Sequence, residues 1–349
     1  MTERVSTGII STKHWHGRSA LVALVVVLAF VPGCAQKGSP VEPGGGLGGY
    51  RIVGSLTFGG YAEDVEVTGD LCVVAASQGG LVLVDVSDAT NPVFLGAGQA
   101  VYPVTGCSYI ESDSLGFAAI GAQGIFVFDC RDQANPVYMN NGQGAFTRDV
   151  ITREGTPGVE HEVLTADGYG VRTQRCYYYE PLDDWFFAQG DDEGGAGVSR
   201  GIGANGDYAL IAREELGLAI YDAADYTDVF LVGEVDTPGE ARAVAGSGDY
   251  AYVADWRMGL QVVDMSDAAN PVIVGSAEME GLADGIAYHD EKVFVAAHTG
   301  GLRVFDVSDP TNPTAVGHLE TPFANEVFVT DDYVYVADRD WGLVIAEEE

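Results

Sequence analysis

The chain has 349 residues, of which 47% are hydrophobic, and its 52 acidic and 17 basic side chains give a formal net charge of −35. This apolar content is ample for a folded core and excludes a globally disordered chain. The acidic surplus argues against nucleic acid as a partner, because basic groups are needed to neutralise phosphates. It equally argues against electrostatic docking on anionic lipid.

The first 33 residues have the layout of a secretory signal, with basic residues ahead of an apolar run at residues 20–30. The run is short for a membrane-spanning helix. The Val-Pro-Gly-Cys sequence that follows is similar to a bacterial lipobox, and this resemblance implies that Cys34 is lipidated. Ala35 carries no aspartate-type retention signal, which implies the outer membrane or cell surface. The alternative is an ordinary signal peptide with an incidental cysteine.

Residues 34–49 are rich in glycine and proline without any apolar period, which predicts a flexible tether. From Tyr50 onward the chain repeats itself. The clearest copies are GGLVLVDVSDATNPVFLG from Gly79, MGLQVVDMSDAANPVIVG from Met258 and GGLRVFDVSDPTNPTAVG from Gly300.

One glycine opens each repeat, and successive copies lie 41 to 47 residues apart, close to the period of propeller repeats. Seven units fill residues 50–349, so we predict an all-β, seven-bladed β-propeller with four antiparallel strands per blade. The opening glycines are Gly80, Gly124, Gly170, Gly217, Gly259, Gly301 and Gly342.

Each unit resolves into four short strands, as the unit around Gly259 illustrates. Strands are predicted at residues 241–245, 250–254, 260–264 and 272–275, where Val, Ile and Tyr runs are separated by turn residues. The third strand is apolar without alternation, which is typical of a strand buried on both faces.

The last unit ends after its third strand, and residues 51–56 at the N-terminus resemble the missing fourth strand. We therefore predict that the N-terminal strand completes the last blade and closes the ring.

The third-strand sequence LVLVD at residues 81–85 and its copies resemble the LVIVD-repeat family of bacterial and archaeal surface proteins. The resemblance covers residues 51–345 and implies the propeller fold, but it implies no particular reaction. The unit around Gly170 departs from the pattern, because the polar residues 172–175 replace the apolar strand.

The domain contains four cysteines, Cys72, Cys107, Cys130 and Cys176, and three pairings are open to them in an exported protein. Cys130 and Cys176 occupy equivalent positions of neighbouring repeats. Because equivalent outer strands should be separated by more than the disulfide limit of about 7 Å, we predict that these two are not joined.

Three features of the sequence could carry chemistry, but none of them indicates a catalytic residue. The aspartates that end the third strands could bind calcium, but capping of their own turns is the simpler reading. The glycine-rich residues 201–206 precede a strand where a dinucleotide fingerprint requires a helix. The four domain histidines, His161, His289, His298 and His318, fall at unrelated repeat positions, so no metal or triad geometry is implied.

The basic residues gather on one predicted face. The position leading into the first strand of each unit, and the loop joining its second and third strands, lie on the same rim because strand direction alternates. A concave mouth with these residues suits a carboxylate, a sulfate, an acidic sugar or an acidic protein segment. The alternative is that the arginines pair with acidic neighbours and only close the ring. The candidate ligand-binding residues are Arg148, Arg200, Arg242, Arg213, Arg257, Arg339, Trp256, Trp341 and His298.

The Gly170 unit also carries aromatic runs at residues 177–179 and 185–187. These could form a protein contact, although they are also what a third and a fourth strand would bury.

The leading hypothesis is a monomeric, extracytoplasmic binding or scaffold module that is held at the membrane by lipid on Cys34 and recognises an acidic small ligand, glycan or protein. No cofactor or metal is expected. The alternatives are a propeller hydrolase or lyase acting on an acidic saccharide, and a passive architectural protein of the envelope.

Overall fold

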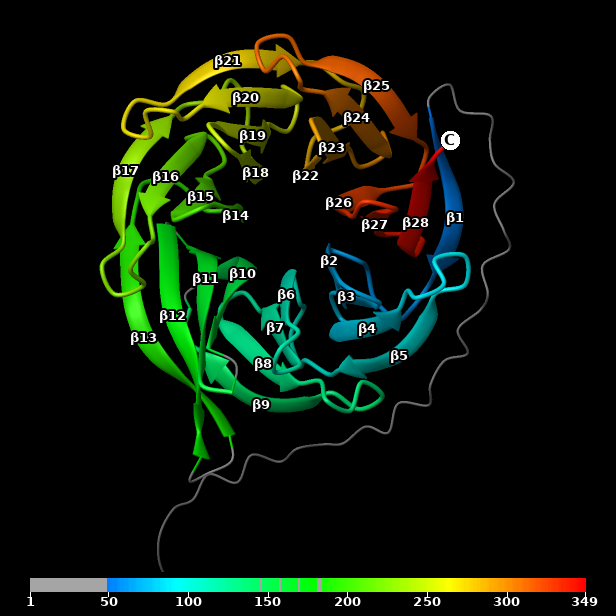
Figure 1. The fold of residues 1–349 in the computed structure, drawn as a ribbon, viewed down its shortest axis with the longest axis vertical. Helices are drawn as coiled ribbons and strands as arrows, with labels where there is room; N and C mark the ends of the chain where they lie inside the picture. The colour runs from blue at the N-terminus through cyan, green and yellow to red at the C-terminus, as the bar shows by residue number, and fades with distance from the viewer. Residues whose placement is uncertain (1–48, 145, 157, 169, 181–183) are drawn as a thin grey trace, which may run out of the picture. The chain divides into compact units, whose positions relative to one another are not determined.

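The computed structural model describes residues 49–349 except 145, 157, 169 and 181–183. In this part of the chain, seven four-stranded antiparallel sheets stand around a central axis (Figure 1), so the prediction of a seven-bladed β-propeller is confirmed. The described ranges hold no helix long and apolar enough to cross a membrane. The predicted signal segment, Cys34 and almost all of the tether lie outside the described residues.

The first strand of each blade lies nearest the axis and the fourth lies at the rim (Figure 1). Blade one contains β2 (Asp64–Thr68), β3 (Leu71–Ala75), β4 (Leu81–Asp85) and β5 (Val93–Gly98). Blade two contains β6 (Gly106–Ile110), β7 (Leu115–Ala119), β8 (Ile125–Asp129) and β9 (Val137–Gly142). Blade three contains β10 (Thr147–Thr156), β11 (Glu160–Asp167), β12 (Gly170–Tyr179) and β13 (Asp184–Gly194).

The other four blades repeat this order. Blade four contains β14 (Gly201–Asn205), β15 (Tyr208–Ala212), β16 (Leu218–Asp222) and β17 (Phe230–Val235). Blade five contains β18 (Ala243–Ser247), β19 (Tyr250–Ala254), β20 (Leu260–Asp264) and β21 (Val272–Ala277). Blade six contains β22 (Gly285–His289), β23 (Lys292–Ala296), β24 (Leu302–Asp306) and β25 (Thr314–Leu319). Blade seven contains β26 (Ala324–Val329), β27 (Val334–Asp338), β28 (Gly342–Glu348) and β1 (Tyr50–Leu56).

The hydrophobic core lies between the blades. Third strands such as β4 are buried along the four apolar residues before the terminal aspartate, as their continuous apolar sequence predicts. Each core cluster joins neighbouring blades; one unites Val82 and Val84 of blade one with Leu343 and Ile345 of blade seven. A single blade therefore has no core of its own and depends on its neighbours.

The glycine that marks the repeat has a physical cause. Gly80 and Gly259 have φ values of +86° and +72°, a region that side-chain-bearing residues rarely adopt. A Cβ atom at either position would lie 2.2 or 2.3 Å from the carbonyl oxygen of Gly98 or Ala277 on the fourth strand. Only glycine allows this approach, so the period is visible in the sequence.

In blade five the predicted second and third strands agree with β19 and β20. The first strand begins two residues later than predicted, at Ala243. The cause is that Ala241 already exchanges hydrogen bonds with Glu214 of blade four, which leaves the ladder with β19 to start at Ala243.

The N-terminal strand closes the ring as predicted. β1 pairs antiparallel with β28, from Tyr50 opposite Glu348 to Leu56 opposite Leu343. The last blade thereby acquires its fourth strand, and the outer edge of β28 is paired.

Blade three differs from the others in length and polarity. Its strands have 8 to 11 residues, against five to seven elsewhere, and run beyond the ring (Figure 1). The polar residues of β12 are satisfied locally: Arg172 Nε donates to Asp167 at 2.6 Å, and Gln174 Nε2 donates to the Gln143 carbonyl of blade two at 2.7 Å. The polar strand β12 is therefore a regular member of the sheet of blade three.

The four cysteines are buried, and none forms a disulfide. Cys130 and Cys176 are not joined, as predicted. Burial raises the pKa of the Cys130 thiol to about 12, so it is protonated at neutral pH.

Deletion of residues 50–58 is expected to lower the melting temperature markedly and broaden the transition, because blade seven loses its fourth strand and the ring its closure. Thermal unfolding followed by circular dichroism measures this. A melting curve identical to that of the intact domain would contradict closure by β1.

Candidate functional site

The positions leading into the first strands are structurally equivalent, as the repeat alignment predicts. The backbone N–H groups of Glu63, Arg200 and Arg242 each donate to the carbonyl of the alanine that ends the second strand of their blade, at 2.8 Å in all three cases. The side chains at these positions therefore stand at one rim around the axis.

The loops between second and third strands meet the same rim through a residue in the left-handed conformation. Glu214, Trp256 and His298 occupy this position in blades four, five and six, with φ values of 43°, 49° and 50°. Each exchanges two backbone hydrogen bonds with the segment leading into the next blade; Trp256 does so with Ala283 at 3.2 and 3.0 Å. The backbone is thus constant while the side chains differ.

Three arginines from consecutive blades crowd together on this rim. Arg200 Nε and Arg242 Nη1 lie 3.7 and 4.0 Å from the same Glu214 carboxylate, and Arg242 also pairs with Glu240. Burial lowers the pKa of Arg200, and the charges of Arg242 and Arg148 lower it further. Positive charge is therefore concentrated here and only partly neutralised.

An arc of alternating aromatic and basic side chains continues from Arg242 across three more blades. The Arg242 guanidinium lies 4.1 Å from the centroid of Trp256. The Trp256 ring meets His298 edge to face at 4.9 Å, and His298 stacks on Phe323 at 4.3 Å. Arg339 then lies 5.1 Å from the Phe323 centroid and 4.8 Å from that of Tyr61 in blade one.

Two acidic groups belong to this arc. His298 Nε2 and Asp284 Oδ2 are 2.8 Å apart, so the imidazole is fixed by a carboxylate. Burial raises the pKa of Glu63, against the opposing charges of Arg339, Arg200 and His298. A carboxyl group with a raised pKa and an oriented imidazole can exchange protons with a bound molecule.

We use the name arginine face for six of the nine predicted residues, which the structure brings together. The other three have no hydrogen bond, ion pair or ring contact with these six among the described residues. Arg213 is buried and its Nη2 binds Glu234 at 2.7 Å, because its position is equivalent to the buried Asp255 and Asp338. Arg257 follows Trp256 in the same loop and is exposed, and Trp341 packs on the core between blades six and seven. The arginine face comprises Arg148, Arg200, Arg242, Trp256, His298 and Arg339.

Sequence reasoning missed the aromatic partners Tyr61 and Phe323. Both lie two residues before the equivalent repeat position, which Glu63 and Asn325 occupy just before or at the start of the first strand. The repeat alignment therefore contained the signal, but ring contacts between blades are not visible in a linear pattern.

A second group missed by sequence reasoning consists of carboxyls on the innermost strands. Asp64 accepts the Cys107 N–H of the next blade at 2.7 Å, and Asp149 accepts the Ile202 N–H at 2.9 Å. Burial raises the pKa of Glu66 to about 7 and that of Asp149 to about 8, with nearby Asp64 raising both further. Glu326 likewise accepts the Ile286 N–H at 2.9 Å. These groups connect blades, and the described residues contain no cluster able to hold a metal ion.

The remaining sequence motifs serve the fold. Asp85 and Asp264 accept the N–H of Ser87 and Ser266 at 2.9 Å, which confirms that the recurrent aspartates cap their own turns. Residues 201–206 form β14 and a turn, so they do not open a helix.

The aromatic runs of blade three face one another across two strands. Tyr177 and Tyr178 of β12 contact Phe186 and Trp185 of β13, at centroid distances of 6.3 and 5.7 Å. Trp185 is buried, whereas Tyr179 is 46% exposed. Packing within the blade therefore explains some of these aromatic residues but not all of them.

A profile of the LVIVD repeat matches residues 59–97, 196–237, 238–278, 280–321 and 323–346, together more than half of the chain. The protein therefore belongs to the LVIVD repeat family, as its third strands predict. The unmatched stretch contains blades two and three. No curated protein matches the chain.

Two solved structures show the same architecture. The chain is similar to the WD40 β-propeller domain of Doa1, with a TM-score of 0.62 and 12% identity over 86% of this chain and 98% of that one. It is also similar to the computationally designed protein Ika8, with a TM-score of 0.56 and 11% identity over 82% of this chain and 83% of that one. At these identities the likeness concerns the fold alone.

Because of the carboxyls on the innermost strands, we predict that the free energy of unfolding falls as the pH rises from about 5 to 8. Their folded-state pKa values lie above the unfolded values near 4, so the unfolded state releases these protons first. Glu66→Gln is expected to make the free energy of unfolding fall by about 1 kcal/mol less over this pH range, as measured by urea titration. This value is set below the full effect of the pKa shift because water screens part of the interaction. Glu215→Gln, at an exposed site, is the control, and an unchanged pH slope in Glu66→Gln would contradict the prediction.

Proposed function

We propose that the protein is a binding module that recognises an acidic ligand through the arginine face. The observation that carries this proposal is that Arg200 and Arg242, from adjacent blades, both lie within 4.0 Å of the Glu214 carboxylate, while Arg242 also pairs with Glu240. In a chain with a net charge of −35, such crowding of guanidinium groups is the exception. An anion bound between them relieves their mutual repulsion.

The Arg242 side chain supports this proposal by its fixed position. It is 13% exposed and lies over Trp256, and its Nε has no hydrogen-bond partner among the described residues. A guanidinium held in place on an aromatic ring loses little conformational entropy on binding a carboxylate or sulfate. The arc toward Arg339 gives an extended acidic glycan or peptide a second cationic contact.

A second candidate function is acid–base catalysis on an acidic saccharide, as in a hydrolase or lyase. The observation that favours it is the placement of Glu63, whose pKa is raised by burial, within the electrostatic reach of Arg339 and the His298–Asp284 pair. A protonated carboxyl and an oriented imidazole are the groups that general acid–base catalysis requires.

We further propose that the module is held at the cell envelope by lipid on Cys34. This rests on the signal-like N-terminus and the Val-Pro-Gly-Cys sequence. The acidic domain then stands away from the membrane on a glycine- and proline-rich tether.

The double variant Arg200→Glu/Arg242→Glu is expected to lose at least tenfold in affinity for an acidic polymer, since each charge-assisted hydrogen bond contributes about 1.5–3 kcal/mol. Polygalacturonate and dextran sulfate serve as probes, uncharged dextran as the blank, and biolayer interferometry as the measurement. Wild-type affinity should also weaken with added salt.

The control for this experiment is Arg131→Glu, which makes the same kind of charge change at an exposed turn on the opposite rim. Equal binding by both variants and the wild type would refute the arginine face as the site and favour an architectural role. Turnover of polygalacturonate that disappears in Glu63→Gln would favour the enzyme.

Cys34→Ala is expected to abolish incorporation of labelled palmitate and to release the protein from the membrane fraction. Expression in a bacterial host with lipoprotein-processing enzymes, followed by fractionation, measures both effects. A Cys72→Ala variant controls for loss of a domain cysteine. Membrane association that persists in Cys34→Ala would rule out a lipid anchor at this residue.

A further inference from the structure

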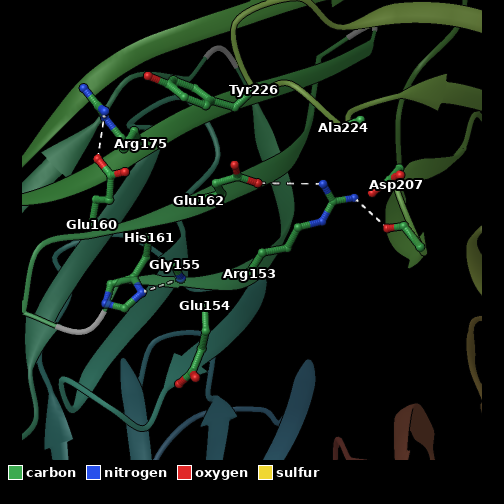
Figure 2. A pocket seen from close by; sticks show the side chains of 11 residues that line it. Arg153, Glu154, Gly155, Glu160, His161, Glu162, Arg175, Asp207, Ala224 and Tyr226 are labelled. Carbon is green, nitrogen blue, oxygen red and sulfur yellow. Dashed lines mark hydrogen bonds and ion pairs between the residues drawn. The ribbon is translucent and has the colours of Figure 1, made fainter.

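A cleft separates blades three and four on the face opposite the arginine face. It lies where the long strands β10 and β11 run past the ring and meet the two turns of blade four, and its volume is about 270 Å³. Figure 2 shows side chains from both blades around it. This volume is close to the lower end of ligand clefts, about 300 Å³, so the ligand it fits is small.

The walls of the cleft are fixed before any ligand arrives. The Arg153 guanidinium reaches from blade three to the carbonyl oxygens of Ala223 and Gly206 in blade four, at 2.7 and 3.1 Å. The carbonyl of Tyr226 accepts hydrogen bonds from Thr173 Oγ1 and the Asp191 N–H, at 2.5 and 3.0 Å. Blade three thus holds the turn that presents the Tyr226 ring, and a rigid site binds with little loss of entropy.

Both arginines of the cleft are paired with carboxylates, whereas Glu154 and Asp207 in its lining have no ion-pair partner among the described residues. Arg175 Nη1 binds Glu160 at 2.7 Å, and Arg153 Nη1 lies 3.7 Å from Glu162 (Figure 2). Arg175 also lies 5.4 Å from the Tyr226 centroid, and its Nε is buried without a hydrogen-bond partner among the described residues. The cleft therefore presents both donors and acceptors beside an aromatic wall.

This arrangement disfavours an anion, and the paired arginines oppose a cation beside Glu160 and Glu162. An anion near Arg175 would meet Glu160 and Glu162, whereas an ammonium near Glu162 would meet Arg153. Burial raises the pKa of Glu162, which further reduces the attraction of the cleft for a cation. Hydroxyl groups both donate and accept hydrogen bonds, so they match paired carboxylates and guanidinium groups without net charge.

We propose that this cleft is a binding site for one neutral pyranose ring, as a free sugar or as a unit of a glycan. The ring packs its C–H face against Tyr226, while its hydroxyls donate to Glu162 and accept from the exposed part of the Arg175 guanidinium. The site is separate from the arginine face, because it is built by the opposite ends of the strands.

The test uses the folded domain with the methyl glycosides of glucose, galactose, mannose and N-acetylglucosamine. Saturation-transfer NMR detects binding and titration calorimetry gives the Kd, which for so small a ligand is expected near about 1 mM. Tyr226→Ala is expected to weaken the bound sugar at least tenfold, and Tyr226→Phe to retain it. Short oligosaccharides of the bound sugar show whether a free unit or a glycan residue is preferred.

Tyr138→Ala, at an exposed ring on β9, is the matched control, and circular dichroism confirms that each variant is folded. Arg200→Glu/Arg242→Glu should leave sugar binding unchanged, which separates this site from the arginine face. The proposal is overturned if none of the glycosides binds, if Tyr138→Ala weakens binding as much as Tyr226→Ala does, or if sulfate or spermidine occupies the cleft in their place.

Discussion

At five of the seven junctions in the described residues, a blade is joined to the next by the same short backbone bridge. After the second strand, one residue bridges to the segment that leads into the following blade; Glu214 exchanges two hydrogen bonds with Ala241, and His298 does so with Ala324. For a residue with a side chain, the left-handed conformation at this point costs about 1–2 kcal/mol. The cost is offset because the connection sets the angle between blades and thereby the core that neighbouring blades share.

The same connection explains why one rim carries the chemistry. The hydrogen bonds involve only backbone atoms, so the fold accepts Ser77, Gly121, Glu214, Trp256 or His298 at the equivalent position. The side chain at this position is not needed for the backbone bridge, but the bridge fixes the direction in which it points. Repeat proteins can in this way vary the ligand contacts while the scaffold stays constant.

Most of the fold could be predicted because the features that define it are local. A glycine with positive φ, an apolar third strand and a capping aspartate recur in sequence wherever they recur in space. The burial of Arg213 and the contact of Arg339 with Tyr61 could not be predicted this way, since they depend on how two blades meet. The long strands of blade three replace the repeat signal with polar residues, so the cleft beside them had no linear signature.

Closure by β1 also sets the order in which the chain can fold. Tyr50 is synthesised almost the whole domain ahead of Glu348, its partner in the finished sheet. Until β28 exists, the first strand has nothing to pair with, and the early blades present an open side. Such long-range pairing is slow and leaves apolar edges exposed meanwhile. Completion of the ring is therefore a late step in folding. A chain truncated before β28 would lack the strand with which β1 pairs, and the ring would stay open.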